Sequence, residues 1–299
     1  MNPLVRAIAV VAPPPSLGDN TGDLDRLKKV LAPHLAGVVP MVPYQRLGKV
    51  AERFRAAGFS GTAIVNDMGG CPVLVDFLPQ PPVLAGMALD LGTTHLEATL
   101  LDLTSGKVLA HADLENGQIG YGADILTRIH HAAKEEGLAE LHQAIIGSIN
   151  ELAAELAGIS GLAVAEIRAL SVSGNTSMVH FFLKLNPYHL CREPYIPMVN
   201  APDPCLAGEL KLAIHSAAVV WILPSVGSYF GGDLISGVLA SGIDQQQETC
   251  MLIDVGTNAE VLVGNREWLI ACAGAAGPAL EGGVARMGMR AGPGAIEHV

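Results

Sequence analysis

The sequence has few basic residues and no concentrated run of them. Its 18 lysines and arginines are outnumbered by 29 aspartates and glutamates, which gives a formal net charge of −11. Proteins that bind nucleic acids usually carry a basic patch or stripe that neutralises phosphates. The charge balance therefore argues against a DNA or RNA partner.

Cysteine is also scarce, and no two cysteines form a Cys-x-x-Cys pair. The five in the chain are scattered: Cys71, Cys191, Cys205, Cys250 and Cys272. This spacing argues against a zinc site, a local iron-sulfur cluster and a disulfide framework. We expect reduced thiols in a cytoplasmic protein.

Long hydrophobic runs are missing as well. The apolar stretch 6–12 ends at three consecutive prolines, and the stretch 213–226 is interrupted by His215 and Pro224. The first is too short for the apolar region of a signal peptide, and the second cannot span a bilayer. We therefore expect a soluble protein with no membrane partner.

What is present suits an α/β protein of more than one unit. Half of the residues are hydrophobic and 34 of 299 are glycine, which favours close-packed strands with many tight connections. A chain of this length exceeds a typical single core, so two or three compact units are expected.

The first unit is predicted to be a small α/β domain over residues 1–82. Hydrophobic periodicity predicts a βααββ order with a strand at 7–12, helices at 23–35 and 43–57, and strands at 62–65 and 73–77. The proline-rich stretch 78–86 then reads as a stiff linker.

The second unit, predicted over residues 83–249, begins with a three-strand meander at 87–91, 96–103 and 108–114. A helix follows, in which leucines and isoleucines between 138 and 156 form one stripe at 3.6-residue spacing. Apolar strands at 167–172 and 219–223 each run into a helix. The resulting order, βββαβαβα, is that of a ribonuclease-H-like lobe.

The meander then starts again in residues 250–299. Asp90-Leu91-Gly92-Thr93-Thr94 is followed 164 residues later by Asp254-Val255-Gly256-Thr257-Asn258. A repeat at the spacing of one lobe predicts an internal duplication. The second lobe is expected to be incomplete, and its uncovered sheet edge could support a homodimer.

Each copy brings an aspartate to a strand end and then reverses the chain through Gly-Thr. Glycine lets the backbone approach an anion closely, and the following amides and hydroxyls can donate to a phosphate. Asp90 and Asp254 could hold a hydrated Mg²⁺ that bridges phosphate oxygens. Walker-A and GxGxxG fingerprints are absent, so the phosphate site predicted here is a pair of facing hairpins.

Two further polar groups lie where a strand or loop enters a helix. Ser173, Gly174 and Asn175 precede one helix, whose first N–H groups could favour an anion, although a plain N-cap explains them too. Asp233 opens the next helix. It could act as the base for water attack on a γ-phosphate, or simply cap the helix.

The chain resembles the acetate-kinase, sugar-kinase, heat-shock-chaperone and actin superfamily (ASKHA). More narrowly, it resembles the ATP-dependent reductive activators of corrinoid proteins. The resemblance rests on the blocks ALDLGTTHLEATLLDLTSGKVLA, NGQIGYGADILTRI, SVSGNTSMVHFFL, LIDVGTNAEVLVG and AAGPALEGG…MGMRAGPGAIEHV, and the first unit resembles that family's middle domain.

The resemblance implies an ATPase-type activator that returns a Co(II) corrinoid to Co(I). It implies ATP and Mg²⁺ as cofactors. The residues that match the two phosphate hairpins are Asp90, Gly92, Thr93, Thr94, Asp254, Gly256, Thr257 and Asn258. It also implies a corrinoid protein as partner.

Relatives carry an iron-sulfur domain that this chain lacks, so we expect the electron to come from a separate domain or a low-potential donor. Two alternatives remain open. One is a small-molecule kinase of the same superfamily, in which Asp233 activates a substrate hydroxyl. The other is a module that binds a corrinoid protein without turning over nucleotide.

Overall fold

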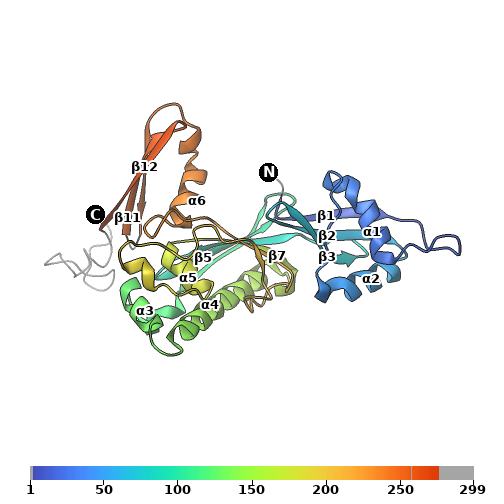
Figure 1. Ribbon diagram of the computed structural model, residues 1–299, viewed down its shortest axis with the longest axis horizontal. Coiled ribbons are helices and arrows are strands. Elements are labelled where there is room, and N and C mark those ends of the chain that lie inside the picture. The colour runs from blue at the N-terminus through green and yellow to red at the C-terminus, as the bar shows by residue number, and fades with distance from the viewer. Residues whose placement is uncertain (1–2, 257, 276–299) are drawn as a thin grey trace.

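The computed structural model describes residues 3–256 and 258–275 (Figure 1). In this part of the chain the strands form three sheets. A small helix-covered sheet lies at one end of the molecule, a large lobe occupies the centre, and the third sheet projects away from that lobe. No helix among the described residues is both long and apolar enough to cross a membrane.

The small unit is an antiparallel sheet with helices on one face. Its strands lie in the order β1-β2-β3, and the βααββ order predicted from sequence is confirmed. The helices bury leucines at helical spacing, and Phe54 packs edge-on against Phe59 and Phe77 at 5.1 and 5.0 Å between ring centroids. The elements are β1 (Val5–Val11), α1 (Asp23–Leu31), η1 (Ala32–Leu35), η2 (Tyr44–Arg46), α2 (Leu47–Ala56), β2 (Ser60–Met68) and β3 (Cys71–Leu78).

The opposite face of this sheet packs against the central lobe. Because side chains alternate along a strand, Ala63 and Val65 point to the helices while Ile64 points to the lobe. Ile64 shares a buried cluster with Ala169 and Val219 of the lobe. The small unit and the lobe are thus joined by a continuous apolar contact.

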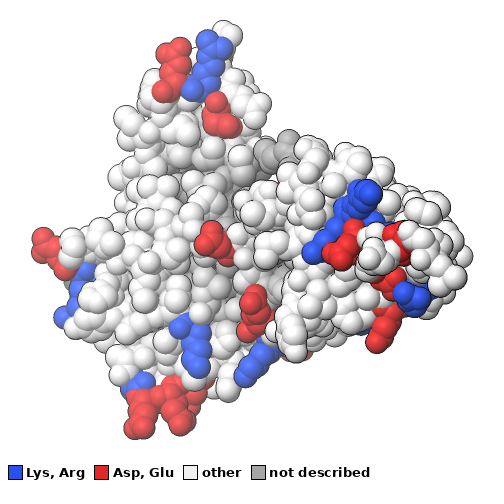
Figure 2. Space-filling view, turned by 45° about the vertical axis from the view of Figure 1, so that its right-hand side comes forward, with Lys and Arg blue, Asp and Glu red and all other residues white. Residues whose placement is uncertain are grey.

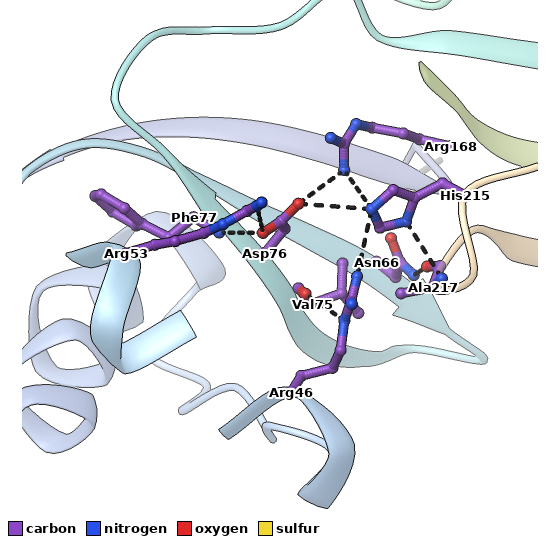
Figure 3. Close-up of polar contacts among 9 residues, drawn as sticks. All are labelled: Arg46, Arg53, Asn66, Val75, Asp76, Phe77, Arg168, His215 and Ala217. Carbon is purple, nitrogen blue, oxygen red and sulfur yellow. Dashed lines mark hydrogen bonds and ion pairs between the residues drawn. The ribbon is translucent and has the colours of Figure 1, made fainter. Parts of the chain in front are cut away.

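A buried ionic network lies beside that contact (Figure 3). The Asp76 carboxylate is 1 % exposed and accepts from Arg53 of the small unit at 2.5 Å and from Arg168 of the lobe at 3.3 Å. His215 of the lobe lies 3.6 Å from the same carboxylate, and Arg46 lies 3.3 Å from the His215 ring. We call these five residues the joint network.

The central lobe contains a six-stranded sheet in the order β6-β5-β4-β7-β9-β8. β4 pairs antiparallel with β5 and parallel with β7, and β7 pairs parallel with β9. This order confirms the predicted ribonuclease-H-like lobe. The strands are β4 (Ala85–Leu91), β5 (His95–Asp102), β6 (Val108–Glu115), β7 (Ile167–Gly174), β8 (Cys205–Leu206) and β9 (Val219–Ile222).

Helix α4 supplies most of the cover for one face of this sheet. Its predicted stripe is confirmed, with Leu141, Ile145, Ile149, Leu152 and Leu156 fully buried and Leu138 partly buried. The helices of the lobe, with η for the 3₁₀ helices, are η3 (Gly117–Tyr121), α3 (Ile125–Ala132), α4 (Gly137–Ser160), η4 (Val164–Glu166), α5 (Thr176–Phe182), η5 (Tyr188–Cys191), α6 (Gly232–Ser241) and η6 (Ile243–Gln245).

The third sheet repeats the opening meander of the lobe, as the sequence predicts. It consists of β10 (Cys250–Val255), β11 (Asn258–Asn265) and β12 (Trp268–Ala275) in sequential antiparallel order. One face packs on α6 through Leu234, Val238 and Leu262. On the other face Met251, Ile253 and Val255 are exposed.

Candidate functional site

A pocket of about 820 Å³ lies between the central sheet, helix α6 and strand β10. Its floor is the face of the sheet opposite to α4, and alternation along the strands brings polar side chains to it. The polar residues that line it are Asp90, Glu97, Thr99, Ser171, Ser173, Asp233, Ser236 and Asp254. The volume is within the usual range for a small-molecule or cofactor site, about 300–1,000 Å³.

Asp90 and Ser173 are neighbours because they end two parallel strands. In the register between β4 and β7, Asp90 pairs with Ser173 and Leu91 with Gly174. A side chain on Gly174 would approach the Leu91 carbonyl oxygen to 2.8 Å, so glycine permits the close pairing. The carboxyl ends of parallel strands are where α/β sheets bind ligands.

The carboxylates of the pocket repel one another. Burial, followed by the charges of Asp233, Glu97 and Asp254, raises the pKa of Asp90 to about 6. Burial also raises the pKa of Asp233, with a contribution from Asp254. A bound cation would relieve this repulsion.

Asp254 approaches the same pocket from the third sheet. In each meander the aspartate of the first strand pairs with a glutamate of the second: Asp90 with Glu97, and Asp254 with Glu260. The duplication therefore includes a carboxylate pair that the Asp-x-Gly-Thr motif does not contain. The second turn is one residue shorter than the first, so a comparison at fixed spacing misses this second match.

The Gly92–Thr94 corner is held tightly by the lobe. A side chain on Gly92 would lie 2.2 Å from the His95 carbonyl oxygen, which only glycine avoids. Thr93 is buried, whereas Thr94 is exposed. Of the matching second corner, Gly256 is exposed, Thr257 lies outside the described residues, and the same holds for the Asn258 side chain at the start of β11.

Asn175 links this corner to helix α5. Its Oδ1 accepts from the Met178 N–H at 3.0 Å, as an N-cap does, and its Nδ2 donates to the Thr93 hydroxyl at 3.0 Å. Both ends of the amide thus have protein partners. The structure places Asn175 behind the corner, as a support for Thr93.

Asp233 lies in the first turn of α6 and lines the pocket together with Asp90 and Asp254. It does not cap the helix from the N-cap position, which is occupied by Gly231, although its Oδ1 accepts from the Leu234 N–H at 2.9 Å. In the next turn, Ser236 and Ser173 share a hydrogen bond of 3.0 Å across the pocket wall.

The donor set fits a hydrated cation better than a directly bound one. Among the described residues, no three histidine, cysteine or acidic side chains are grouped closely enough to hold a metal ion. Water-mediated contact with Asp90 and Asp254 remains compatible with the pocket. The five cysteines, all free, are dispersed over the molecule and do not fit an iron-sulfur cluster.

Several residues in and behind the candidate site escape the sequence analysis. Glu97 and Ser236 line the pocket, and the strand alternation around Asp90 could have indicated Glu97. Asn116 and Arg128 are completely buried behind the corner. They belong to the block NGQIGYGADILTRI, which supports the family resemblance without revealing what these two side chains contact.

Charged side chains are sparse on the face of the molecule shown in Figure 2, and acidic and basic groups are interspersed there without a broad basic patch. Contacts made by this face would therefore involve mainly uncharged groups.

Three family models match consecutive parts of the chain. The RACo linker region matches residues 1–80, the RACo middle region residues 85–246, and the C-terminal domain of RACo, the ASKHA domain, residues 248–299. The middle region thus matches the second unit of the chain, whereas the sequence analysis assigned it to the first. The first unit matches the linker region instead.

Individual relatives agree with these matches. The chain is 31% identical over 284 residues to the corrinoid activation enzyme RamQ of Eubacterium limosum, covering 93% of this chain and 46% of that protein. It is 26% identical over 223 residues to a [Co(II) methylated amine-specific corrinoid protein] reductase of Methanosarcina barkeri, covering 71% of this chain and 40% of the relative.

A solved structure of a reductive activator for a corrinoid, iron-sulfur protein superposes with a TM-score of 0.86 at 36% identity. The superposition covers 98% of this chain and 47% of that one. The chain therefore spans less than half the length of each of these relatives.

Proposed function

The chain belongs to the RACo family, and from this premise we propose that it takes part in the ATP-dependent reductive activation of a corrinoid protein, from Co(II) to Co(I). In this proposal the chain binds Mg-ATP and docks the corrinoid protein, and the electron comes from an iron-sulfur domain or an external low-potential donor. The names of the relatives support the reaction class.

The observation that carries the proposal is the meeting of Asp90, Asp233 and Asp254 in one pocket. Two of these residues come from the repeated corners and the third from the helix between them. A nucleotide with Mg²⁺ would supply the binding and hydrolysis free energy that makes an unfavourable electron transfer possible.

In this proposal the residues of the site have different roles. Asp90 and Asp254 would orient the hydrated cation, and the Gly92–Thr94 corner would donate N–H groups to the phosphates. Asp233, whose pKa is raised by burial, would hold a water molecule or accept its proton. Ser173 and Gly174 would keep the floor of the pocket open, and Gly256, Thr257 and Asn258 would form the facing corner.

Titration calorimetry with Mg-ATP on the 299-residue chain tests the proposal directly. Asp90→Asn and Asp254→Asn are each expected to weaken binding about tenfold or more, the scale of one lost charged contact of about 1.4 kcal/mol. Asp113→Asn is the matched control, because Asp113 is exposed on a neighbouring strand and does not line the pocket. Unchanged affinity in both pocket variants would remove the site assignment.

A second assay separates the reaction classes. ATP hydrolysis is measured with and without a Co(II) corrinoid protein, while Co(I) is followed by its absorption in the presence of a low-potential reductant. Stimulation by the corrinoid protein supports activation. Stimulation by a sugar or a carboxylic acid would instead indicate a small-molecule kinase, and absence of nucleotide binding would indicate a docking module.

A further inference from the structure

A group of polar side chains lies behind the Gly92–Thr94 corner, on the side of the buried core. These side chains do not line the pocket. Asn116, Gln118 and Arg128 are each 0 % exposed. Asn116 precedes η3, Gln118 belongs to it, and Arg128 comes from α3. Burying such groups is costly unless each finds hydrogen-bond partners, so their contacts indicate what they do.

Their contacts converge on the carbonyl oxygens of the corner. Asn116 donates from Nδ2 to the Gly92 oxygen at 2.8 Å and from its backbone N–H to the Thr94 oxygen at 2.8 Å. Arg128 donates from Nη2 to the Thr93 oxygen at 2.7 Å. All three carbonyl groups of the corner are therefore turned toward the interior.

This arrangement fixes the direction of the corner's N–H groups. A trans peptide unit is planar, and its N–H points opposite to its C=O. The N–H groups of Thr93 and Thr94 belong to the same peptide units as the Gly92 and Thr93 carbonyls. They therefore point away from Asn116 and Arg128, which is the orientation that a phosphate-binding corner requires.

Arg128 also places a positive charge behind the corner. Burial lowers the pKa of Arg128 to about 10, against the effect of the nearby Asp124, so the guanidinium stays charged at neutral pH. Its other donors reach the Gly122 oxygen at 2.8 Å and the Gln118 Oε1 at 3.2 Å. Among the described residues no carboxylate lies within ion-pair distance of Arg128.

We infer that Arg128 and Asn116 are positioning residues for the polyphosphate of the nucleotide. They hold the first corner with its amides outward, and Arg128 adds a buried positive charge, not ion-paired among the described residues, that favours an anion at that corner. The inference rests on the proposed function, since it specifies which residues prepare the site for the phosphates.

The test is Mg-ATP binding by the full chain and three variants, measured by calorimetry below the melting temperature of each. Arg128→Gln removes the charge and the guanidinium that contacts Thr93, Gly122 and Gln118, and is expected to weaken binding at least tenfold. Arg128→Lys keeps the charge but cannot reach three acceptors, and is expected to lose about threefold. This partial rescue by lysine would not follow from a purely structural role.

Arg168→Gln is the matched control. Like Arg128, Arg168 is a buried arginine, but it lies in β7, contacts Asp76 in the joint network and makes no contact with the corner. This variant is expected to lower the melting temperature and leave the affinity for Mg-ATP within twofold.

Three outcomes are decisive. Wild-type binding together with Arg128→Gln affinity within twofold of wild type would overturn the inference and leave the proposed function standing. Loss of affinity in Arg168→Gln as large as in Arg128→Gln would show a general stability effect and also overturn it. Absence of binding in the wild-type chain would overturn both.

If the Arg128→Gln variant does not fold, the Asn116→Ala variant tests the positioning role instead. This change removes the Nδ2 donor to Gly92 and the Oδ1 acceptor of the Gln118 N–H, and it keeps the backbone bond to Thr94. Binding is expected to weaken threefold to tenfold. Hydrogen exchange of the backbone amide at position 116, which donates to the Thr94 oxygen, should accelerate in the same variant. Unchanged exchange and unchanged affinity would contradict the positioning role.

Discussion

Among the carboxylates of the pocket, Asp90 has the largest upward shift of its pKa. Its pKa rises from an ordinary 3.8 to about 6, first through burial and then through Asp233, Glu97 and Asp254. The folded chain therefore retains a proton on Asp90 at pH values where the unfolded chain has lost it. The contribution of Asp90 to the free energy of unfolding therefore falls as pH rises from about 4 through 6.

Asp90→Asn should remove this penalty. At pH 8 the variant is expected to be more stable than wild type by about 1 kcal/mol, a figure reduced for solvent screening because the side chain reaches open space. That corresponds to about 2–4 °C in melting temperature for a chain of this size. The difference should vanish near pH 4, and thermal melts from pH 4 to 8 would measure it.

Asp102→Asn provides a comparison of opposite sign. The Ser105 hydroxyl and the Thr104 N–H lower the pKa of Asp102, so its carboxylate is stabilised by folding. This second substitution should therefore reduce stability at neutral pH. A stability gain at pH 8 in both variants would contradict the assigned environment of Asp90.

At the residue scale, candidate site residues can be predicted from the sequence where they belong to a repeated motif. Residues that contact the site only through tertiary packing cannot. Asp90, Asp233 and Asp254 were candidates from motif and position, and the structure brings them to one pocket. The burial of Arg128 and Asn116 depends on where η3 and α3 pack, which no local pattern encodes. Their role as nucleotide-site residues remains a proposal, as does that of the other corner residues.

The hairpin between β4 and β5 depends on one glycine. A methyl group on Gly92 would meet the backbone oxygen of His95 at 2.2 Å, and a backbone atom cannot rotate away as the end of a side chain can. The corner would have to open, and the donors behind it would lose their acceptors.

Gly92→Ala is thus expected to cost about 2–3 kcal/mol through overpacking. Gly147→Ala is the matched change in the same lobe: Gly147 lies on the exposed face of α4 and has nothing within 4 Å of the added carbon. It should gain about 0.5–1 kcal/mol by restricting the unfolded chain and improving helix propensity. Urea denaturation of both variants checks the two signs, and equal effects would refute the steric argument.

Whole elements were easier to predict than their side-chain contacts, for a physical reason. Period-2 and period-3.6 patterns and turn residues are local properties, so the meander of β4–β6, its copy in β10–β12 and the stripe of α4 follow from sequence. The shorter second turn and the pairing of Asp254 with Glu260 required the strand register. Register depends on partners that are distant along the chain.

For the molecule as a whole, the joint network connects the small unit to the central lobe. Burial alone would raise the pKa of Asp76, but the hydrogen bond with His215 and the charges of Arg53 and Arg168 outweigh it and lower that pKa well below its usual range. The carboxylate therefore stabilises the fold above the unfolded-state pKa. This contribution is lost as pH falls through that value and below.

Asp76→Asn should weaken the joint. Removing one partner of a buried charged group leaves Arg168 uncompensated, at a cost of about 3–5 kcal/mol. The small unit is then expected to detach before the lobe unfolds, which would expose the linker around residues 79–84 to proteases. Limited proteolysis and the slope of urea denaturation would report this change.

Asp23→Asn is the control in the same small unit. Asp23 pairs with Arg55, whose side chain is 61% exposed, and such pairs are worth about 1 kcal/mol or less. Cleavage at the linker should remain as slow as in wild type. Equally fast cleavage in both variants would indicate that the network does not hold the units together.

The distribution of the free thiols has a practical consequence. Cys71 begins β3 in the small unit, Cys272 lies in β12 of the projecting sheet, and both are exposed. These two strands lie well apart in Figure 1. Cys191, Cys205 and Cys250 are less accessible, and burial raises the pKa of Cys205 to about 11, which keeps it unreactive. Maleimide dyes should therefore favour the two outer positions, so that energy transfer between them could report the distance from the small unit to the projecting sheet in the native sequence.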